Sequence, residues 1–493
     1  MKTIILTTIQ ILFIIFPIIS FSQQKNNSAQ IYIDTKLKTD TLFTNSITAI
    51  YAIDKNGKTI AEWNSNYNLI PASTLKTITT GIALSYLGTD YKYETKIGIT
   101  GKIKDSTLIG DLYIIGGGDP TLGSKDTIAT PIDTVFTMWR DAICRLGIKS
   151  ISGSIIVDDS WFVREQMPDS WTWDDFGTYY GCAANGLSFC ENIQYHTLIP
   201  GANVGDTASI VNIYPVIPDF TIDNEVITSK IGSKNTSYYY TQDLAPIGKY
   251  IGNIPINTKY KTVENSNKFP HLSCGHHFKE FLNNNGVSVC NKIIDCETLN
   301  FKDSLEKPRI IITTYSPELI RIVEVTNKKS NNFYAETLLK TIGKEVTGVG
   351  CYDSSIVAIS KLLNTSGLNT NNIALKDGSG LSRQNLLSPK FLCDFYFMMR
   401  ENGIFAEYLK TFPHPGENGT LKYVLRKTPQ WLKGRIYAKS GSLSGVRCYA
   451  GYVNRGDKYG IISFCVMVNN YTVKTAVIQP KIEEFMLELA KCY

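Results

Sequence analysis

The sequence predicts an α+β fold in which an antiparallel sheet flanked by helices is split by a large, mostly β insertion. Three observations lead to this prediction. Strand patterns lie near both ends of the 493-residue chain, and helical patterns flank them. The stretch between, residues 93–307, instead holds short apolar alternations and turn residues. A single sheet built from both chain ends accounts for this arrangement.

The first residues predict a secretory signal peptide over 1–22. Lys2 precedes an apolar run over 4–21, which polar residues follow. Gln10 and Pro17 interrupt the run, which disfavours a permanent membrane anchor, and no later stretch is apolar for long enough to span a bilayer. We therefore expect an exported, soluble protein, with the periplasm as its compartment.

The composition disfavours some classes of function. The formal net charge is only +6, and no run of Lys and Arg is dense enough for a nucleic-acid footprint. The 11 cysteines are thinly scattered, unlike those of a small disulfide scaffold. Cys182 with Cys190, and Cys290 with Cys296, lie close enough in sequence to form disulfides in an oxidising compartment. An odd count leaves at least one free thiol.

The N-terminal strands form a predicted hairpin. Residues 46–53 and 59–63 alternate as strands do, and the turn at 54–57 contains the Asn-Gly pair typical of hairpins. A helix follows, and Pro71 marks its start. Apolar residues then recur on a helical period, at Leu75, Ile78 and Ile82.

The region over 93–307 is predicted to be an insertion of two subdomains, so that 23–92 and 308–493 form one split domain. Short strands are expected within the insertion over 106–115, 153–157, 208–213 and 251–256, and a helix over 274–284. Helical spacing resumes at Ser316. Near the C-terminus, strands are predicted over 435–440, 446–453 and 458–468, followed by a helix over 475–491. These three strands are expected to join the N-terminal hairpin in one sheet.

Ser73 and Lys76 lie at the start of the predicted helix. They are three residues apart, so their side chains share one helix face. A deprotonated amine there can take the hydroxyl proton, and the helix N-terminus favours a developing oxyanion. The same residues also fit an N-cap hydroxyl beside a solvated lysine. Two further Ser-x-x-Lys matches, at 22–25 and 304–307, do not open an amphipathic helix.

Other catalytic schemes have less support in the sequence. There are only five histidines and no Gly-x-Ser-x-Gly, so a serine enzyme here needs a lysine base. No His-Glu-x-x-His occurs, and the Cys-Gly-His-His stretch at 274–277 lacks a second cluster to complete a metal site. Asp174 and Asp175, near Trp171 and Trp173, are best explained as solvated or capping groups, although contact of these aromatics with a polymer stays open.

Two later motifs supply the partners that a Ser-Lys site needs. Ser330 and Asn332 form a Ser-x-Asn before a helical pattern, where the hydroxyl can relay a proton and the amide can align a peptide group. Lys439, Ser440 and Gly441 form the only Lys-[Ser/Thr]-Gly of the chain, at the end of a predicted strand. The cation and hydroxyl can hold a carboxylate, and the glycine lets a ligand approach the backbone.

In this order the three motifs resemble the active-site serine penicillin-recognising enzymes. The closer similarity is to the D-alanyl-D-alanine carboxypeptidase/endopeptidase family, the low-molecular-mass class C penicillin-binding proteins. It rests on residues 71–76, 330–336, 377–382 and 439–446, and residues 110–120 resemble the family's inserted region. The resemblance implies a penicillin-binding-protein/β-lactamase-like transpeptidase fold. One departure is Ser440, where the family usually has Thr, although a hydroxyl is retained.

The resemblance implies a two-step acyl transfer on the stem peptides and cross-links of peptidoglycan. Ser73 would attack the D-alanine carbonyl, and Lys76 would be the base. Desolvation and a neighbouring cation, Lys439, would keep that base neutral. Ser330 would relay a proton to the leaving amine. β-Lactams are the covalent inhibitors that this implies, and neither a cofactor nor a metal is needed.

The resemblance also assigns the substrate contacts. Asn332 would bind the substrate amide, while Lys439 and Ser440 would hold its terminal carboxylate. The backbone N–H groups of Ser73 and Ser442 would form the oxyanion hole. Two alternatives stay open: a β-lactamase, and a non-catalytic protein that binds the cell wall or senses β-lactams. The class A deacylating Glu-x-x-Leu-Asn pattern is absent between the last two motifs, which disfavours the first; the intact motifs disfavour the second.

Overall fold

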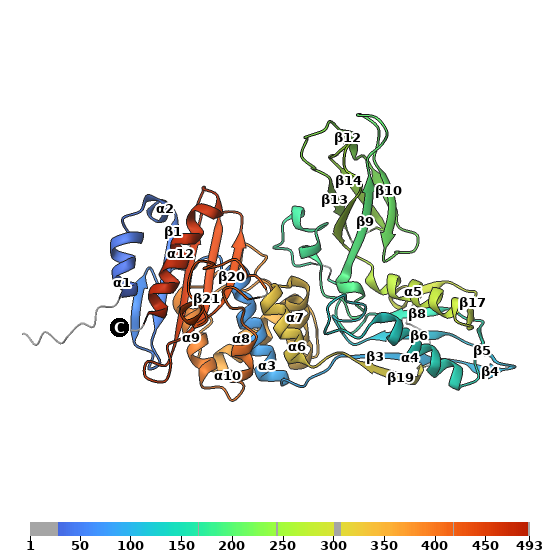
Figure 1. Ribbon diagram of the computed structural model, residues 1–493. Helices are drawn as coiled ribbons and strands as arrows, with labels where there is room; N and C mark the ends of the chain where they lie inside the picture. Colours follow the sequence, from blue (N-terminus) through green and yellow to red (C-terminus); the bar gives the residue numbers. More distant parts are fainter. Residues whose placement is uncertain (1–27, 166, 243–244, 300–306, 418, 492–493) are drawn as a thin grey trace, which may run out of the picture.

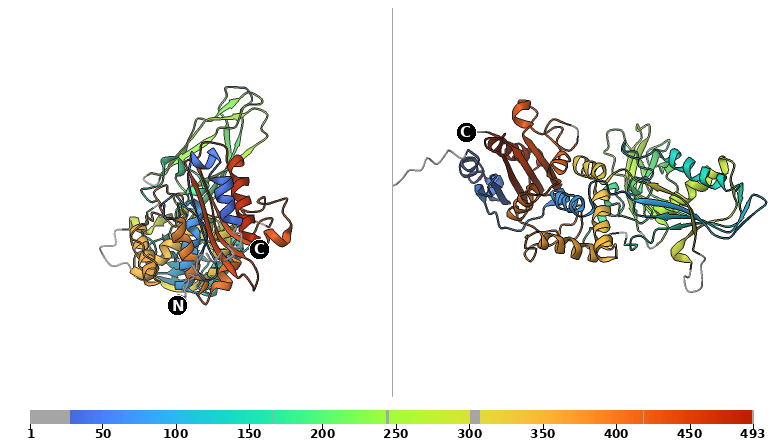
Figure 2. Two further views of the ribbon diagram at one scale, coloured as in Figure 1. Left: turned by 90° about the vertical axis from the view of Figure 1, so that its left-hand side faces the viewer. Right: turned by 90° about the horizontal axis from the view of Figure 1, so that it is seen from below.

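The computed structural model describes all residues except 1–27, 166, 243–244, 300–306, 418 and 492–493. The predicted signal peptide, 1–22, lies outside the described residues. The molecule is elongated, as Figure 1 and Figure 2 show. One half contains segments from both ends of the chain, the other contains the middle of the sequence, and a β-rich subdomain projects from the second half.

The first half is built on a five-stranded antiparallel sheet of order β2-β1-β22-β21-β20. Its strands are β1 (Ile47–Ile53), β2 (Thr59–Trp63), β20 (Ile436–Leu443), β21 (Val446–Asn454) and β22 (Ile461–Asn469). β1 pairs with β22 from Ile47 opposite Asn469 to Ile53 opposite Ser463. The prediction of one antiparallel sheet built from both chain ends is confirmed.

Helices cover both faces of this sheet (Figure 1). Alternate residues of β1 enter different cores, because successive side chains of a strand point to opposite faces: Ala49 and Tyr51 join one core, Ile50 and Ala52 the other. The first core is shared with α3 (Lys76–Leu87), α6 (Leu319–Lys329), α7 (Asn332–Thr347), α8 (Tyr352–Thr365), α9 (Pro389–Arg400) and α10 (Phe405–Lys410). The second is shared with α1 (Ser28–Tyr32), the π-helical turn η1 (Ile33–Leu37), α2 (Thr41–Thr44), α11 (Gln430–Lys433) and α12 (Thr475–Ala490).

The inserted region contains a five-stranded sheet, β18-β8-β6-β3-β19, and a four-stranded sheet, β17-β7-β5-β4. The strands are β3 (Glu94–Ile99), β4 (Lys102–Lys104), β5 (Thr107–Ile109), β6 (Leu112–Gly116), β7 (Ser150–Ile151), β8 (Ile155–Asp158), β17 (Ser288–Val289), β18 (Ile293–Asp295) and β19 (Arg309–Tyr315). α4 (Ile132–Arg145) and α5 (Pro270–Asn284) share a core with these sheets.

Two details of the insertion differ from the sequence-based expectation. β19 pairs with β3, from Arg309 opposite Ile99 to Tyr315 opposite Glu94, so the chain leaves the inserted sheet after Tyr315 rather than at 308. The strand expected over 106–115 is interrupted at Gly110, where a Cβ would lie 2.1 Å from the Thr100 carbonyl oxygen. β5 and β6 consequently join different sheets. The alternation of apolar residues predicts a strand, but it does not reveal that β19 pairs with β3 or that β5 and β6 belong to different sheets.

The projecting subdomain has a small core of its own and rises from the inserted region in Figure 1. It comprises β9 (Ile193–Ile199), β10 (Ser209–Tyr214), β11 (Thr221–Asn224), β12 (Ile227–Ser229), β13 (Tyr238–Thr241), β14 (Ile247–Ile251), β15 (Asn253–Pro255) and β16 (Lys261–Ser266). They form sheets of order β10-β9-β16, β11-β14-β13 and β12-β15. Short 3₁₀ turns complete the insertion: η3 (Trp173–Asp175), η4 (Tyr179–Gly181), η5 (Cys190–Asn192) and η6 (Cys296–Thr298).

The two disulfides that closeness in sequence would allow are not formed. Cys182, Cys190, Cys290 and Cys296 are all free thiols. The Cys182 thiol instead donates to the Asn192 carbonyl over 2.9 Å, and burial raises its pKa to about 12. Closeness in sequence therefore did not pair these cysteines in the folded chain.

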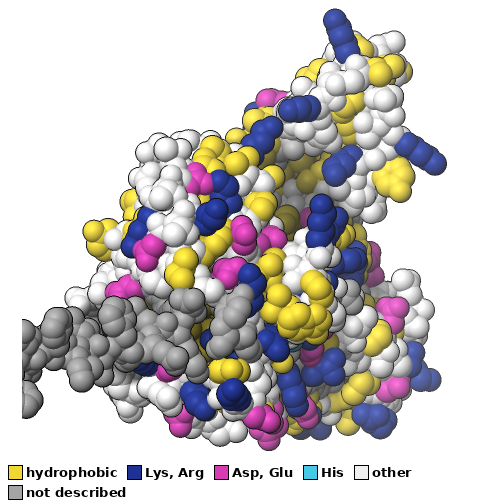
Figure 3. Space-filling view, turned by 60° about the vertical axis from the view of Figure 1, so that its left-hand side comes forward, with side chains coloured by type: hydrophobic (Ala, Val, Ile, Leu, Met, Phe, Trp, Pro, Cys, Tyr) yellow, Lys and Arg dark blue, Asp and Glu magenta, His cyan; other side chains and the backbone are white. Residues whose placement is uncertain are grey.

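The surface is mixed in charge. On the face seen in Figure 3, Lys and Arg side chains are interspersed with Asp and Glu and with apolar groups. Within the described ranges, no helix combines the length and the apolar character needed to cross a bilayer.

Candidate active site

Ser73 lies in a 3₁₀ turn, η2 (Ala72–Leu75), that leads directly into α3. Residues three apart eclipse each other in a 3₁₀ helix, and Lys76 Nζ accordingly lies 3.0 Å from Ser73 Oγ. Ala72, just before the serine, has φ of +46°, a conformation that costs a non-glycine residue free energy. The turn therefore holds the serine at a defined, partly exposed position beside the buried amine.

Lys76 is fully buried, and its amine has two further partners. Nζ lies 2.6 Å from Asn332 Oδ1 and 2.7 Å from the Ser379 carbonyl oxygen. Both of these oxygens can only accept hydrogen bonds. A neutral amine has two N–H bonds for them and one lone pair, which is then left for the Ser73 hydroxyl. The arrangement suits a lysine that removes the serine proton.

The pKa of Lys76 lies close to neutral pH. Burial lowers its pKa to about 7, although the charges of Glu336 and Asp377 raise it. Lys439 was expected to lower the pKa of Lys76. Instead, it is the pKa of Lys439 that is held well below its usual value, first by burial and then by the charges of Lys76 and Arg447. The neutral form of Lys76 therefore results from desolvation.

This pKa predicts the pH dependence of acylation. A base must be unprotonated to act, so kcat/KM should rise as the pH increases through about 7 and level off above it. The rate of acylation by a penicillin between pH 5.5 and 8.5 measures this limb. A rate that stays flat through pH 7 would show that a group of different pKa is the base.

Glu336 and the loop over 377–382 form the wall behind Lys76, and sequence reasoning gave neither of them a role. Both oxygens of the buried Glu336 carboxyl accept backbone hydrogen bonds, from Gly378 N over 3.0 Å and Ser379 N over 2.8 Å. Burial raises the pKa of this carboxyl. Because the Ser379 carbonyl accepts from Lys76, Glu336 indirectly positions the amine.

Ser330 and Asn332 lie where α6 gives way to α7. Ser330 ends α6 in the left-handed conformation, with φ of +59°. Asn331 then caps α7 by accepting from Tyr334 N. This sharp junction directs Ser330 toward Lys439 and Asn332 toward Lys76. The Asn332 amide also donates to the Tyr180 carbonyl over 2.9 Å and has a second N–H with which to contact a substrate.

Lys439 is buried at the centre of β20. Its Nζ donates to Ser330 Oγ over 2.8 Å and to the Ser440 carbonyl over 2.8 Å. Ser440 itself is almost completely buried, and Ser442, two residues on, is the β20 serine that lines the cavity described below. The structure thus brings Ser73, Lys76 and the Ser-x-Asn and Lys-Ser-Gly motifs together.

Gly441 has a packing role that the sequence did not predict. A Cβ at this position would lie 2.7 Å from the Pro71 carbonyl oxygen and 3.1 Å from Ser73 N. The glycine therefore lets β20 lie against the turn that contains Ser73, where no side chain fits.

Gly441→Ala is expected to push β20 and the nucleophile turn apart. Overpacking of this kind typically costs about 1–3 kcal/mol, so the melting temperature and the rate of acylation by a penicillin should both fall. Gly456→Ala is the matched control for folding, because a Cβ added there would have nothing within 4 Å, although the φ of +79° at this residue adds some strain of its own. Unchanged acylation in Gly441→Ala would contradict the assigned contact.

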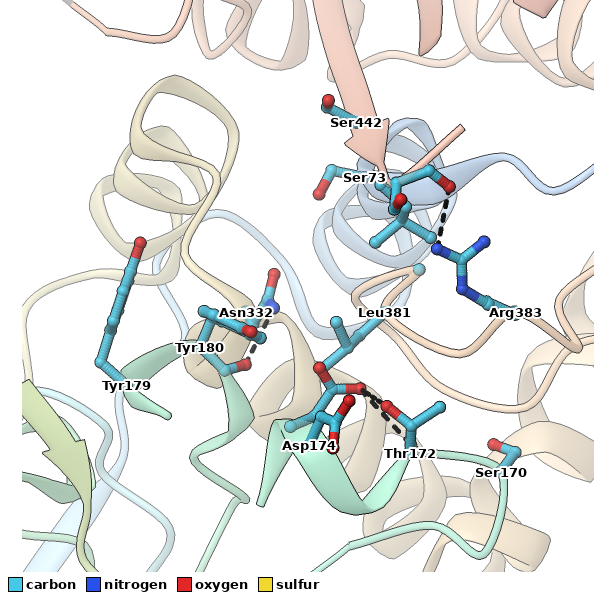
Figure 4. Close-up of a pocket in the computed structure, with 14 residues that line it drawn as sticks. Ser73, Ser170, Thr172, Asp174, Tyr179, Tyr180, Asn332, Leu381, Arg383 and Ser442 are labelled. Atoms are coloured by element: carbon cyan, nitrogen blue, oxygen red, sulfur yellow. Dashed lines mark hydrogen bonds between the residues drawn. The ribbon is translucent and has the colours of Figure 1, made fainter. Parts of the chain in front are cut away.

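A cavity of about 460 Å³ opens at Ser73. Figure 4 shows Ser73 and Ser442 on one side, with Tyr179, Tyr180 and Asp174 of the insertion across from them. The lining residues are Ser73, Ser170, Thr172, Asp174, Asp175, Tyr179, Tyr180, Asn332, Gly380, Leu381, Arg383, Ser442, Leu443 and Ser444. The Arg383 guanidinium donates to the Ser444 carbonyl over 2.9 Å. The insertion therefore forms one wall of the cavity at Ser73.

Sequence reasoning missed this wall. Asp175 has the expected capping role, since its carboxylate accepts from the Thr172 hydroxyl at the start of η3. Asp174 nevertheless lines the cavity together with Tyr179 and Tyr180. A local pattern identifies the cap but cannot reveal what the loop faces. In the part of the chain that the structure describes, no group of three or more His, Cys, Asp and Glu side chains could hold a metal ion.

Comparison with known proteins decides the family. The profile of the D-Ala-D-Ala carboxypeptidase 3 (S13) family matches residues 29–491. The chain belongs to this family. A D-alanyl-D-alanine carboxypeptidase of Actinomadura sp. strain R39 is 27% identical over 442 residues, which cover 87% of this chain and 78% of that protein. The relationship suggested by the three motifs is confirmed.

Solved structures place this S13 peptidase in the predicted fold. Penicillin binding protein 4 of Haemophilus influenzae is 22% identical, with a TM-score of 0.79 over 91% of this chain and 97% of that one, and it has also been solved with a β-lactam. A predatory peptidoglycan endopeptidase of Bdellovibrio bacteriovorus is 16% identical, with a TM-score of 0.50 over 90% of this chain and 92% of that one. The penicillin-binding-protein-like α+β fold is confirmed.

Proposed function

We propose that this S13 peptidase hydrolyses the bond after D-alanine in peptidoglycan stem peptides and in D-alanyl cross-links, through an acyl-enzyme on Ser73, and that β-lactams acylate the same serine. The observation that carries the proposal is the buried Lys76 amine, 3.0 Å from Ser73 Oγ at the wall of an open cavity. The names of the relatives support the substrate.

In the first step, Ser73 Oγ bonds to the D-alanine carbonyl carbon while its proton passes to Lys76 Nζ. Backbone N–H groups of Ser73 and Ser442 hold the oxyanion, and each such donor is worth about 3 kcal/mol in other serine enzymes. The carbon–nitrogen bond then breaks. Ser330, whose Oγ lies 2.8 Å from Lys439 Nζ, relays to the leaving amine the proton that Lys76 had taken, so that Lys76 and Ser330 both end the step neutral.

In the second step, water adds to the acyl carbon and gives a proton to Lys76. As the bond to Ser73 Oγ breaks, Lys76 returns that proton to Ser73 Oγ, and the free enzyme is restored. Asn332 holds the substrate amide in both steps. Lys439 and Ser440 attract the terminal carboxylate of a carboxypeptidase substrate. The electrostatic pull of Lys439 is strongest when it is protonated, and binding of that carboxylate would favour its protonated form.

A β-lactamase needs a base that activates water, so that the ester between drug and enzyme is hydrolysed quickly. Two buried carboxylates, Glu336 and Asp377, act on the charge of Lys76, and both accept hydrogen bonds from backbone N–H groups of the 377–382 loop. They are committed to holding the loop. This supports a slow second step with β-lactams and hence a peptidase.

The protein acts outside the cytoplasm in this proposal. Residues 1–22 direct its export, and the substrate, the cell wall, lies in the periplasm. Intact mass of the mature protein isolated from its host tests this, since the chain should begin close to residue 23. A chain that keeps Met1 would contradict export by this route.

Digestion of purified peptidoglycan, followed by separation of the fragments, tests the activity. Loss of cross-linked dimers shows endopeptidase activity, and loss of terminal D-alanine shows carboxypeptidase activity. Brief exposure to a penicillin should add the mass of the drug to the intact protein, and the adduct should persist. Rapid turnover of the drug would favour the β-lactamase, and a protein that neither digests peptidoglycan nor forms an adduct would overturn the proposal.

A further inference from the structure

A cluster of aromatic rings lies next to the cavity and has no part in the steps above. Trp173 of η3 stacks with Tyr240 of β13 at 6.5 Å between ring centroids and 23° between planes. Tyr238 packs beside Tyr240 at 4.9 Å. Tyr238 and Tyr240 are two apart on a strand and so share one face. Trp173, Tyr238 and Tyr240 are called the aromatic platform below.

The platform is fixed to the wall of the cavity. The Tyr238 hydroxyl donates to the Asp174 carbonyl, and Asp174 lines the cavity that opens at Ser73. The η3 segment also contacts β13 through backbone: at Gly177 a Cβ would lie 1.8 Å from the Tyr239 carbonyl oxygen. The rings are therefore held by two elements of the insertion and lie one residue from the cavity wall.

The platform is partly open to solvent. Trp173 is 56% exposed and the rings of Tyr238 and Tyr240 are half-buried, whereas Tyr239, the residue between them, is buried in the core of the projecting subdomain. The three platform rings are not part of that core. A patch of exposed apolar groups on a protein surface commonly marks a binding site.

The chemistry of the surface favours a sugar. One face of a pyranose ring presents C–H groups that pack on an aromatic ring, while its hydroxyl and N-acetyl N–H groups donate to carboxylates. The platform provides the rings, and the exposed Asp174 beside it provides a carboxylate, whereas the carboxylate of Asp175 caps η3. An apolar peptide would gain from the rings but not from the neighbouring charges.

We propose that the aromatic platform binds the glycan strand of peptidoglycan while a stem peptide occupies the cavity. This rests on the proposed function. In that substrate about four residues connect the scissile carbonyl to the sugar, and four extended residues span at most about 14 Å. The platform begins at the cavity wall, next to Asp174, so the sugar attached to a peptide in the cavity can lie against its rings. The insertion would thus select polymeric substrate over free peptide.

The test compares two substrates with the full-length enzyme. One is polymeric peptidoglycan, and the other is a soluble sugar-free peptide ending in D-Ala-D-Ala. Trp173→Ala should lower kcat/KM on the polymer about tenfold, the loss expected for one good aromatic contact, and change it less than twofold on the free peptide. Trp173→Phe, which keeps a ring, should restore most of the loss. An equal loss on both substrates, or none on the polymer, would overturn the proposal.

Controls separate the platform from exposed aromatics in general. Tyr260→Ala, on the same projecting subdomain, and Trp431→Ala, on α11, each remove an exposed ring, with 60% and 68% exposure. Neither should alter the ratio of the two activities. Should Trp173→Ala not fold, Tyr240→Ala decides the question, because its ring comes from a different element.

A binding measurement makes the two proposals fail in distinguishable ways. Peptide-free glycan fragments should bind to Ser73→Ala protein and bind at least tenfold more weakly to the same protein with Trp173→Ala. Glycan that does not bind, with the free peptide still cleaved by the unmodified enzyme, overturns the platform alone. An unmodified enzyme that cleaves neither substrate overturns the proposed function instead.

Discussion

Replacing Ser73 by alanine should abolish both the release of D-alanine and the formation of a penicillin adduct. In serine enzymes the loss of the nucleophile lowers kcat by roughly 10⁴–10⁶-fold. The fold should be little affected, because Ser73 is partly exposed and its hydroxyl has Lys76 as its side-chain partner. Intact mass after exposure to a penicillin and digestion of peptidoglycan measure the two losses.

The chain offers a matched control for this experiment. Ser304 begins a second Ser-x-x-Lys match, at 304–307, so Ser304→Ala removes the same local pattern elsewhere. It should form the adduct at the normal rate. If Ser73→Ala still formed the adduct and Ser304→Ala did not, the nucleophile would have been assigned to the wrong motif.

Lys76→Arg should lower the rate of acylation by about 10²–10⁴-fold, the range usual for loss of a general base. Arginine keeps the positive charge, but its guanidinium does not lose a proton in proteins. The substitution therefore separates proton transfer from charge. The limb of the pH profile near 7 should also disappear, because Lys76 is the group that titrates there. Stopped-flow measurement of acylation between pH 5.5 and 8.5 records both effects.

A second buried lysine provides the control. Burial also lowers the pKa of Lys340 on α7, to about 8, but its Nζ donates to the Val163 and Glu165 carbonyls rather than to the serine. Lys340→Arg should lower the melting temperature and leave the pH limb near 7 in place. Acylation of Lys76→Arg at the normal rate would show that Lys76 acts by its charge alone.

The inserted region changes how these catalytic predictions are interpreted. The Tyr180 carbonyl accepts from the Asn332 amide, and Glu191 accepts from the Asn331 amide over 2.9 Å. The insertion thus contacts the Ser-x-Asn motif directly as well as lining the cavity. Substitutions in the insertion can therefore alter acylation without reaching Ser73, and the sugar-free peptide is needed to distinguish this from loss of glycan binding.

The sequence by itself determined the local features of this protein. Hairpin turns, strand alternation and helical periodicity each depend on residues that are close together in the sequence. The strands of the main sheet and the helix after Ser73 could therefore be predicted. The spacing of Ser73 and Lys76 put hydroxyl and amine side by side for the same reason, since i and i+3 neighbour each other in a helical turn.

Only the tertiary structure decided the features that depend on packing between distant segments. The pKa of Lys76 falls to about 7 because α7 and the 377–382 loop bury the amine, and desolvation has no signature in the spacing of a motif. Gly441 is required by the approach of β20 to the turn at Ser73, and β19 belongs with β3 rather than with the helices after it. The cavity wall from Ser170 to Tyr180 comes from a segment without a recognisable motif. Sequence patterns indicate which face of a helix or strand is apolar. Which element packs against that face depends on how distant segments come together in the folded chain.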